Sequence, residues 1–314
     1  MKKVIALILV CLFSLSTVSF AAEFSDMPDD WSTAALQNAV ENGLLSGSDG
    51  KIYPSDNMTR AEMATIMVRA CGATQDADIS AFTDVKLDDW FYSSMSKAVA
   101  MGAFNGSDGK LNPNNYITRQ EAFVVLARVF SLNLDKGIDL TVLDGFKDGG
   151  KISDWARTSV AAIVSNGYVA GANGYINPLN NISRAEFAVV MDRLVKYYID
   201  DPETTKIPSD GNVMIRVGGL NIDTAESSHM VVIGDGVGTA DMSISNGNIS
   251  DKLVVRGGNK VLIDGIFKEV RIVMPNIEVE GDPSNIERVY VAKDSVYSMG
   301  TILSGEPEKA PETK

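Results

Sequence analysis

The 314-residue sequence has few of the residues on which enzymes commonly build an active site. It contains two cysteines and one histidine, and His229 is distant in the sequence from Cys71. A nucleophilic thiol needs a base beside it, so we expect no catalysis by this pair and no catalytic residue elsewhere. Cys71 lies in a helical pattern and is interpreted as a small buried hydrophobic residue. Since Cys11 belongs to a leader segment, no intrachain disulfide is expected.

Long apolar runs are also scarce. Lys2 and Lys3 precede an apolar run at residues 4–12, and small residues follow at 19–21, which is typical of an export signal. Beyond residue 21 no stretch of about 20 apolar residues occurs, so no membrane span is expected. We therefore expect a secreted protein whose mature chain starts near Ala22.

An excess of basic charge is absent as well. The formal net charge is −13, and acidic residues outnumber basic ones in both halves of the mature chain. Nucleic-acid binding relies on a basic surface, so nucleic acid is not an expected partner. An anionic ligand would have to be held by a few locally placed cations.

The sequence does contain a threefold internal repeat before residue 200. In each copy a tryptophan is followed by glycines 12 and 16 residues later, a proline 23 later and an arginine 29 later. The tryptophans are Trp31, Trp90 and Trp155, and the arginines are Arg60, Arg119 and Arg184. The offsets are constant although the spacing between copies varies, which predicts rigid units joined by variable linkers.

Each unit is predicted to form two helices. An aspartate before the tryptophan (Asp30, Asp89, Asp154) is a predicted N-cap of the first helix. Thr59, Thr118 and Ser183, each with a glutamate three residues later, predict capping boxes for the second. Both helices carry one apolar stripe, so three units must pack together into one helical domain spanning about residues 24–200. The tryptophans could close its core or lie at a binding surface.

The arginine after each capping residue needs a separate explanation. A cation in the first helical turn is mildly unfavourable because it opposes the helix dipole. Together with free backbone amides, however, a guanidinium makes an anion site suited to a carboxylate or phosphate. The alternative is a structural salt bridge to a neighbouring unit.

These motifs in three tandem copies, Phe-x-Asp, Asp-Trp, Gly-x-x-x-Gly, Pro and Thr-Arg-x-Glu, resemble the S-layer homology (SLH) domain family. The resemblance covers about 175 residues. It implies a pseudo-threefold helical domain with binding grooves between adjacent repeats. The ligand it implies is the anionic secondary polysaccharide of Gram-positive cell walls, often carrying pyruvate ketals.

The resemblance also implies a set of ligand-binding residues. In it, Arg60, Arg119 and Arg184 contact the ligand carboxylate, while the early aspartates and the tryptophans match the family's other motif positions. The aspartates are Asp26, Asp84 and Asp148, and the loop positions offering amides or hydroxyls are Gly47, Ser48, Gly106, Ser107 and Gly171. Repeat three departs from the pattern, with Ser183 in place of threonine and Ala172 in place of serine.

After residue 200 the composition changes to β-branched residues and glycine. Strand-like runs occur at 231–233, 242–244, 253–255, 261–263, 270–273, 277–279 and 288–291. Their spacing suits a parallel β solenoid or a sandwich, and repeated glycine turns favour the solenoid. The glycine-rich run at 234–238 lacks the Lys and Ser/Thr of a phosphate loop and is interpreted as a turn. No metal or cofactor site is predicted.

The fold class expected is therefore multidomain, α then β. We predict a signal peptide at 1–21, SLH repeats at 24–72, 82–132 and 146–200, a linker at 201–211, a β-rich domain at 212–304 and a disordered tail at 305–314. The expected function is non-enzymatic attachment to the cell wall or S-layer surface. Other S-layer or surface proteins are possible partners of the β domain. Alternatives are a wall-anchored enzyme with its site after residue 200, or a structural S-layer subunit.

Overall fold

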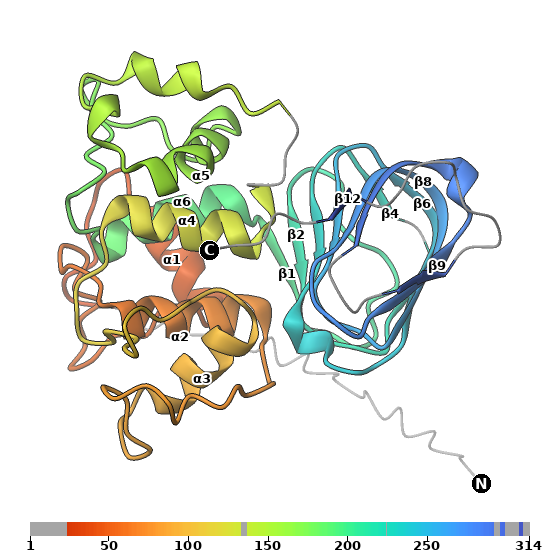
Figure 1. Cartoon of the computed structure of the whole chain (residues 1–314), viewed down its shortest axis with the longest axis horizontal. Coiled ribbons are helices and arrows are strands. Elements are labelled where there is room, and N and C mark those ends of the chain that lie inside the picture. The colour runs from red at the N-terminus through yellow and green to blue at the C-terminus, as the bar shows by residue number, and fades with distance from the viewer. Residues whose placement is uncertain (1–23, 133–136, 224, 292–295, 299–307, 310–314) are drawn as a thin grey trace, which may run out of the picture.

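The chain folds into a helical part followed by a β solenoid, which lie side by side in Figure 1. The structure is a computed structural model that describes residues 24–132, 137–223, 225–291, 296–298 and 308–309. The predicted signal peptide lies outside the described residues. Within those ranges, no helix has the length and apolar character needed to cross a membrane.

Helices come in three pairs, one pair in each repeat. The first helices are α1 (Thr33–Glu41), α3 (Tyr92–Ala100) and α5 (Asp154–Ser165), and the second are α2 (Arg60–Cys71), α4 (Arg119–Val129) and α6 (Arg184–Leu194). Capping boxes at Thr59, Thr118 and Ser183 are confirmed, because each hydroxyl accepts the glutamate amide and each glutamate accepts the cap amide. Two short 3-10 helices, η2 (Leu140–Gly145) and η3 (Gly149–Lys151), precede α5.

The predicted caps of the first helices are wrong. Asp30 accepts hydrogen bonds from the amide and hydroxyl of Ser32, so it closes a turn, and α1 begins only at Thr33. Asp89 accepts from the amide of Lys86 in a turn that precedes α3. Asp154 is the first residue of α5, and Ser153 precedes it without a side-chain cap. An aspartate beside a tryptophan thus marks a turn before the helix in two of the three repeats.

Contacts between the three repeats follow a cyclic order. The first helix of each repeat packs against the second helix of the preceding one: α3 on α2, α5 on α4, and α1 on α6. The backbone before each second helix repeats this order. The amide of Met58 donates to the carbonyl of Ile182, Ile182 donates to Ile117, and Ile117 donates to Met58, at 3.0, 3.1 and 3.0 Å. The last repeat therefore closes on the first.

Every recorded strand pair in the β part is parallel, as a solenoid requires and a sandwich does not. Successive coils stack β1, β2, β5, β7, β8 and β10 on one side, and β3, β6, β8, β9 and β11 on another, while β4 also pairs with β6. The strands are β1 (Tyr197–Ile199), β2 (Val213–Ile215), β3 (Asn221–Ile222), β4 (Ala225–Ser227), β5 (Val231–Ile233), β6 (Met242–Ile249), β7 (Leu253–Val255), β8 (Lys260–Ile272), β9 (Glu278–Gly281), β10 (Ile286–Val291), β11 (Val296–Ser298) and β12 (Glu308–Lys309), with 3-10 turns η4 (Asp235–Val237) and η5 (Pro283–Asn285).

The boundary between the two parts differs from the prediction. Strand β1 pairs with β2, so the solenoid begins at Tyr197 within the residues assigned to repeat three. The segment predicted as a linker contributes Ile207 to the solenoid core. Helix α6 ends because Val195 adopts an extended backbone, which turns the chain directly into the first coil. The predicted tail lies outside the described residues except Glu308–Lys309, which pair with β10.

One side of the solenoid packs on the helical part. In β2, Val213 and Ile215 belong to the solenoid core, whereas Met214 between them belongs to the helical core. Val232 and Val254 occupy the same register in β5 and β7 and also join the helical core. Strands buried on both faces read as continuous apolar runs, which is the sequence pattern of these three strands.

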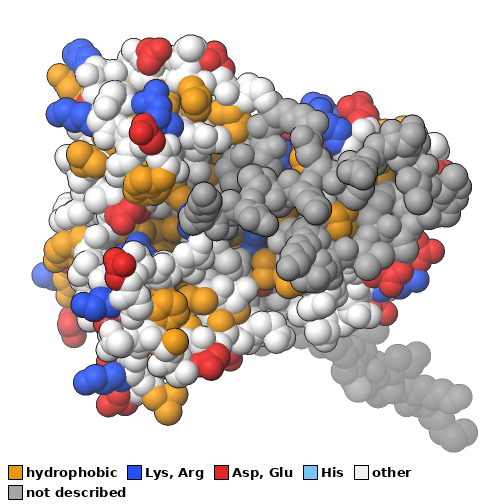
Figure 2. Space-filling model, in the orientation of Figure 1, with side chains coloured by type: hydrophobic (Ala, Val, Ile, Leu, Met, Phe, Trp, Pro, Cys, Tyr) orange, Lys and Arg blue, Asp and Glu red, His pale blue; other side chains and the backbone are white. Residues whose placement is uncertain are grey.

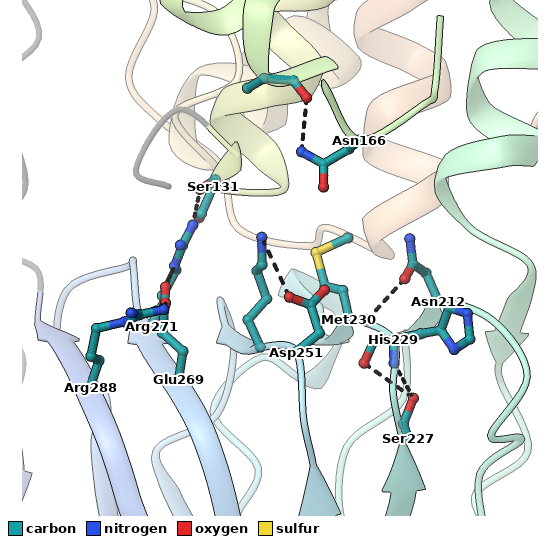
Figure 3. A network of polar contacts seen from close by, with 12 residues as sticks. Ser131, Asn166, Asn212, Ser227, His229, Met230, Asp251, Glu269, Arg271 and Arg288 are labelled. Atoms are coloured by element: carbon teal, nitrogen blue, oxygen red, sulfur yellow. Dashed lines mark hydrogen bonds and ion pairs between the residues drawn. The ribbon is translucent and has the colours of Figure 1, made fainter. Parts of the chain in front are cut away.

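Solenoid arginines satisfy backbone carbonyls at the C-terminal ends of helices. Arg216 donates to the carbonyls of Asn42 and Arg69, both at 3.1 Å. Arg256 donates to Val129 at 3.0 Å and Met101 at 2.6 Å. A third arginine, Arg271, in register with Val254 of β7, donates to Ser131 and also pairs with Glu269, as Figure 3 shows. Cations at these ends complement the helix dipoles and fix the orientation of the solenoid.

The glycine-rich run at 234–238 is the turn that the sequence predicted. A Cβ on Gly236 would lie 2.1 Å from the carbonyl oxygen of Arg216 and 2.9 Å from that of Gly72, which ends α2. A Cβ on Gly234 would lie 2.9 Å from the carbonyl oxygen of Cys71. These glycines are therefore required where solenoid backbone meets helix backbone.

Candidate functional site

The repeated arginines at the second-helix starts reach into the next repeat in the cyclic order. Their Nε atoms donate to backbone carbonyls there: Arg60 to Leu111 at 3.0 Å, Arg119 to Ile176 at 2.8 Å and Arg184 to Ile52 at 2.8 Å. Each also pairs with the capping-box glutamate of that repeat, Glu121, Glu186 or Glu62, at 3.6, 2.9 and 3.7 Å. The salt-bridge alternative is thus present in the structure.

The amides near these arginines are not free, which corrects one part of the predicted anion site. The amides of Arg60 and Ala61 donate to the carbonyls of Asn115 and Pro113, and the other two repeats make equivalent bonds. Burial lowers the pKa of Arg60 and of Arg184 from the ordinary value, and the paired glutamate opposes this shift in each case. Any anion would therefore be bound by guanidinium groups, since the neighbouring repeat occupies the backbone donors.

The early aspartates are clamps within their own repeats. Both carboxylate oxygens of Asp26 accept backbone amides, from Ile52 at 2.7 Å and Tyr53 at 2.9 Å. Asp84 binds the amides of Leu111 and Asn112, and Asp148 those of Ile176 and Asn177, all between 2.7 and 2.9 Å. The carbonyl of each first-named residue accepts the neighbouring arginine. Each aspartate therefore positions the backbone segment whose carbonyl accepts the arginine.

All three tryptophans are exposed, so the core-closing alternative is wrong. Trp31, Trp90 and Trp155 are 65%, 66% and 59% exposed. Trp31 and Trp90 precede the helices of their repeats, and Trp155 lies in the first turn of α5. Exposed aromatic rings of this kind offer flat apolar faces to a ligand.

Two grooves combine residues from all three repeats. Groove A, of about 690 Å³, is lined by the repeat-one loop at Gly47 and Ser48, by helix α2, by Trp90 of repeat two and by Arg184 of repeat three. Groove B, of about 540 Å³, has the equivalent composition one repeat further on. Its wall contains the loop at Gly106 and Ser107, helix α4, Trp155 of repeat three and Arg60 of repeat one.

The structure assembles only part of the predicted residue set in these grooves. Six members line neither groove: Arg119, Trp31, Asp26, Asp84, Asp148 and Gly171. Ala172, which follows Gly171 in the equivalent loop of repeat three, also lines neither of them. At Gly47 and Gly106 the reason for glycine is steric, because a Cβ would lie 2.3 and 2.1 Å from the rings of Phe24 and Phe82.

A second series of arginines was missed by the sequence reasoning. Arg69, Arg128 and Arg193 recur 38 residues after the three tryptophans. Arg69 lines groove A and Arg128 lines groove B. Extending the search for constant offsets past the capping box would have found them. The loops hold another missed signal, since Asp49-Gly50, Asp108-Gly109 and Asn173-Gly174 all have positive φ at both residues, the pattern of a type I′ turn.

The visible face of the helical part carries side chains of both charges (Figure 2). Figure 2 shows basic, acidic and hydrophobic side chains interspersed there, without a field of one sign. Among the described residues, no group of three or more His, Cys, Asp or Glu side chains is placed to hold a metal ion. The grooves offer a ligand guanidinium groups, hydroxyls and aromatic faces.

Comparison with known proteins identifies the helical repeats. The S-layer homology domain profile matches residues 23–64, 81–123 and 145–188. The chain is therefore an SLH-domain protein with three tandem repeats, in agreement with the resemblance seen in the motifs.

Relatives of the chain include surface-layer proteins and enzymes. The surface-layer 125 kDa protein of Lysinibacillus sphaericus is 32% identical over 198 residues, which is 60% of this chain and 16% of that protein. S-layer protein sap of Bacillus anthracis is 26% identical over 66% of this chain and 26% of its own length. An amylopullulanase of Thermoanaerobacterium thermosulfurigenes is 28% identical over 55% of this chain and 9% of its length. The chain thus matches only a minor portion of each relative.

Proposed function

We propose that the helical part attaches the protein non-covalently to a bacterial cell wall by binding anionic secondary polysaccharide in grooves A and B. The observation that carries this proposal is the shared composition of the two grooves. Each places a guanidinium, an exposed tryptophan and a Gly-Ser loop from three different repeats around one opening. A guanidinium recognises a carboxylate or phosphate, and an indole face packs on the apolar face of a sugar ring.

The surface-layer relatives support attachment at the cell surface. A pyruvate ketal would present the carboxylate that the guanidinium groups fit. The acidic net charge of the chain makes such binding dependent on these placed cations.

We propose further that this chain is an anchor without catalytic activity of its own. Cys71 is buried, and burial raises the pKa of its thiol to about 12, so it is protonated at neutral pH. The ring of His229 contacts Ser228 and the carbonyl of Ser209 at an exposed position. Release of reducing sugars or peptides from cell walls by the purified chain would contradict this proposal.

Sedimentation of the mature chain with purified cell walls tests the attachment. The full chain is required, because the solenoid arginines satisfy helix ends that a truncated helical part would expose. Walls stripped of secondary polysaccharide by hydrofluoric acid should lose binding. Undiminished binding to stripped walls would refute the proposal. Mild acid hydrolyses ketals, so its effect separates a pyruvate carboxylate from a phosphate as the anionic group.

Tryptophan variants supply a matched control. Replacing both Trp90 and Trp155 by alanine should weaken wall binding by roughly tenfold or more, because one stacking face is lost in each groove. Trp31→Ala removes an equally exposed ring that lines neither groove, and it should bind within about threefold of the parent chain. Equal losses in the single and double variants would show that the grooves are not the binding surface.

A further inference from the structure

The arginines at offset 38 are equivalent in sequence but differ in their partners. Arg69 donates to the carbonyl of Leu44 at 3.2 Å, and Arg193 donates to the equivalent carbonyl of Tyr168 at 3.3 Å. The side chain of Arg128 has no hydrogen-bond or ion-pair partner among the described residues. It lies in the wall of groove B with Val124 and Val125 of the same helix. Only in repeat two, therefore, is this guanidinium left for another group.

A second cation adjoins it. Burial lowers the pKa of Arg128 most, and the positive charge of Arg60 lowers it further. Arg60 lines the same groove and shares it with one carboxylate, that of Glu121. Two partly desolvated guanidinium groups thus share the one carboxylate in the groove wall, while the charge of Asp84, outside the groove, acts on Arg60 as well. Cations removed from water are costly unless an anion accompanies them.

The two grooves differ in charge although their architecture is the same. Groove A is balanced, because its charged lining residues are Arg69, Arg184, Asp56 and Glu62. Groove B has an excess of two positive charges, because its charged lining residues are Arg60, Lys110, Arg128 and Glu121. An anionic sugar substituent would reduce the positive excess in groove B and would meet no such excess in groove A.

We propose that groove B is the principal anion-binding groove of this protein and that Arg128 is its main ligand-binding cation. This inference rests on the proposed wall attachment and assigns it to one groove. The anionic group is a carboxylate or phosphate of the polysaccharide, which Arg128 and Arg60 bind together. Lys110 adds a charge at the exposed edge of the groove, and Trp155 offers the sugar-stacking face.

The test compares equivalent substitutions in the two grooves of the full mature chain. Arg128→Gln should weaken sedimentation with purified cell walls by about 10- to 100-fold, as expected for loss of charge-assisted hydrogen bonds. Arg69→Gln should weaken binding by a smaller factor, of about threefold, because groove A contributes less to binding than groove B. Arg128→Lys should retain intermediate affinity, because a point charge replaces a bidentate donor. A loss in Arg69→Gln as large as that in Arg128→Gln, or no loss in Arg128→Gln, would overturn the proposal.

A second pair of variants avoids any effect on folding. Lys110 and Lys51 are equivalent exposed residues, but only Lys110 lines a groove. Lys110→Glu should weaken wall binding at least tenfold and reduce its salt dependence, while Lys51→Glu should do neither. Equal effects of the two changes would count against groove B. Failure of the parent chain to bind walls, or equal binding to intact and stripped walls, would instead refute wall attachment itself. Treatment of the walls with mild acid identifies whether the bound anion is a pyruvate carboxylate or a phosphate.

Discussion

Replacing Arg256 by methionine should separate the solenoid from the helical part. The Arg256 side chain is 3% exposed and its partner Asp235 is 10% exposed, with 2.7 Å between Nε and Oδ2. The same guanidinium satisfies the carbonyls of Met101 and Val129 at the ends of two helices. Methionine fills much of the volume but leaves the carboxylate and both carbonyls without their donor. Breaking one partner of a buried pair costs about 3–5 kcal/mol, so we expect a loss of about 4 kcal/mol in the free energy of unfolding.

Urea unfolding followed by two probes measures this loss. All three tryptophans lie in the helical part, so their fluorescence reports that part alone, whereas far-UV circular dichroism also reports the solenoid. The parent chain should unfold in one transition by both probes, and Arg256→Met should shift and separate the two curves. Lys260→Met is the control, because its exposed pair with Glu280 contributes at most about 1 kcal/mol. Adding Asp235→Leu to Arg256→Met should recover part of the loss. An Arg256→Met curve that matches the control would refute the reasoning.

Four further outcomes follow from single sites. Thr118→Ala removes a capping hydroxyl and should cost about 1 kcal/mol in chemical denaturation. Gly236→Ala places a Cβ 2.1 Å from a carbonyl oxygen and should cost roughly 1–3 kcal/mol, while Gly145→Ala meets no atom within 4 Å and should stay within about 0.5 kcal/mol. Desolvation acts to raise the pKa of Asp26, but the backbone amides of Ile52 and Tyr53 that donate to its carboxylate together hold this pKa below its ordinary value. The stability that Asp26 contributes is therefore fully present when the pH is above the pKa of this residue in the unfolded chain, and it is lost as the pH falls through the pKa in the folded chain. Asp26→Asn should consequently flatten the acid limb of a plot of stability against pH. Cys71 should resist a thiol reagent in the native chain at neutral pH and react fully in urea; native labelling at the unfolded rate would contradict its burial.

The sequence alone predicted those features that depend on neighbouring residues. Capping boxes join residues three apart, so Thr59 and Glu62 could be recognised directly, and the apolar stripes of the helices follow from their period. The turn at Asp30 was mistaken for a cap because an aspartate suits either role, and only the position of Ser32 and Thr33 decides between them.

Features that join distant residues could not be predicted in this way. The glutamate that pairs with Arg60 belongs to the next repeat. The residues around Arg60 in the sequence do not show whether its guanidinium faces a glutamate, solvent or a ligand. Strand β1 follows α6 almost directly, and its three residues are too short to show a strand period. Arg69 and Arg128 differ because the guanidinium of Arg69 donates to the carbonyl of Leu44, whereas that of Arg128 has no such partner among the described residues. The repeated sequence pattern is the same at both positions and does not reveal this difference.

The ring of backbone hydrogen bonds through Met58, Ile117 and Ile182 also determines how many repeats this architecture accepts. A linear array tolerates the loss or gain of a unit at its end, because each unit contacts only its neighbours. Here deletion of a repeat would leave one amide and one carbonyl open, and insertion of a fourth would require one of the three bonds to break. The amide of Met58, just before α2 of the first repeat, obtains its acceptor only from Ile182 of the third repeat. Three repeats are therefore the number at which the ring of hydrogen bonds closes, and the ring is complete only after the third repeat has folded.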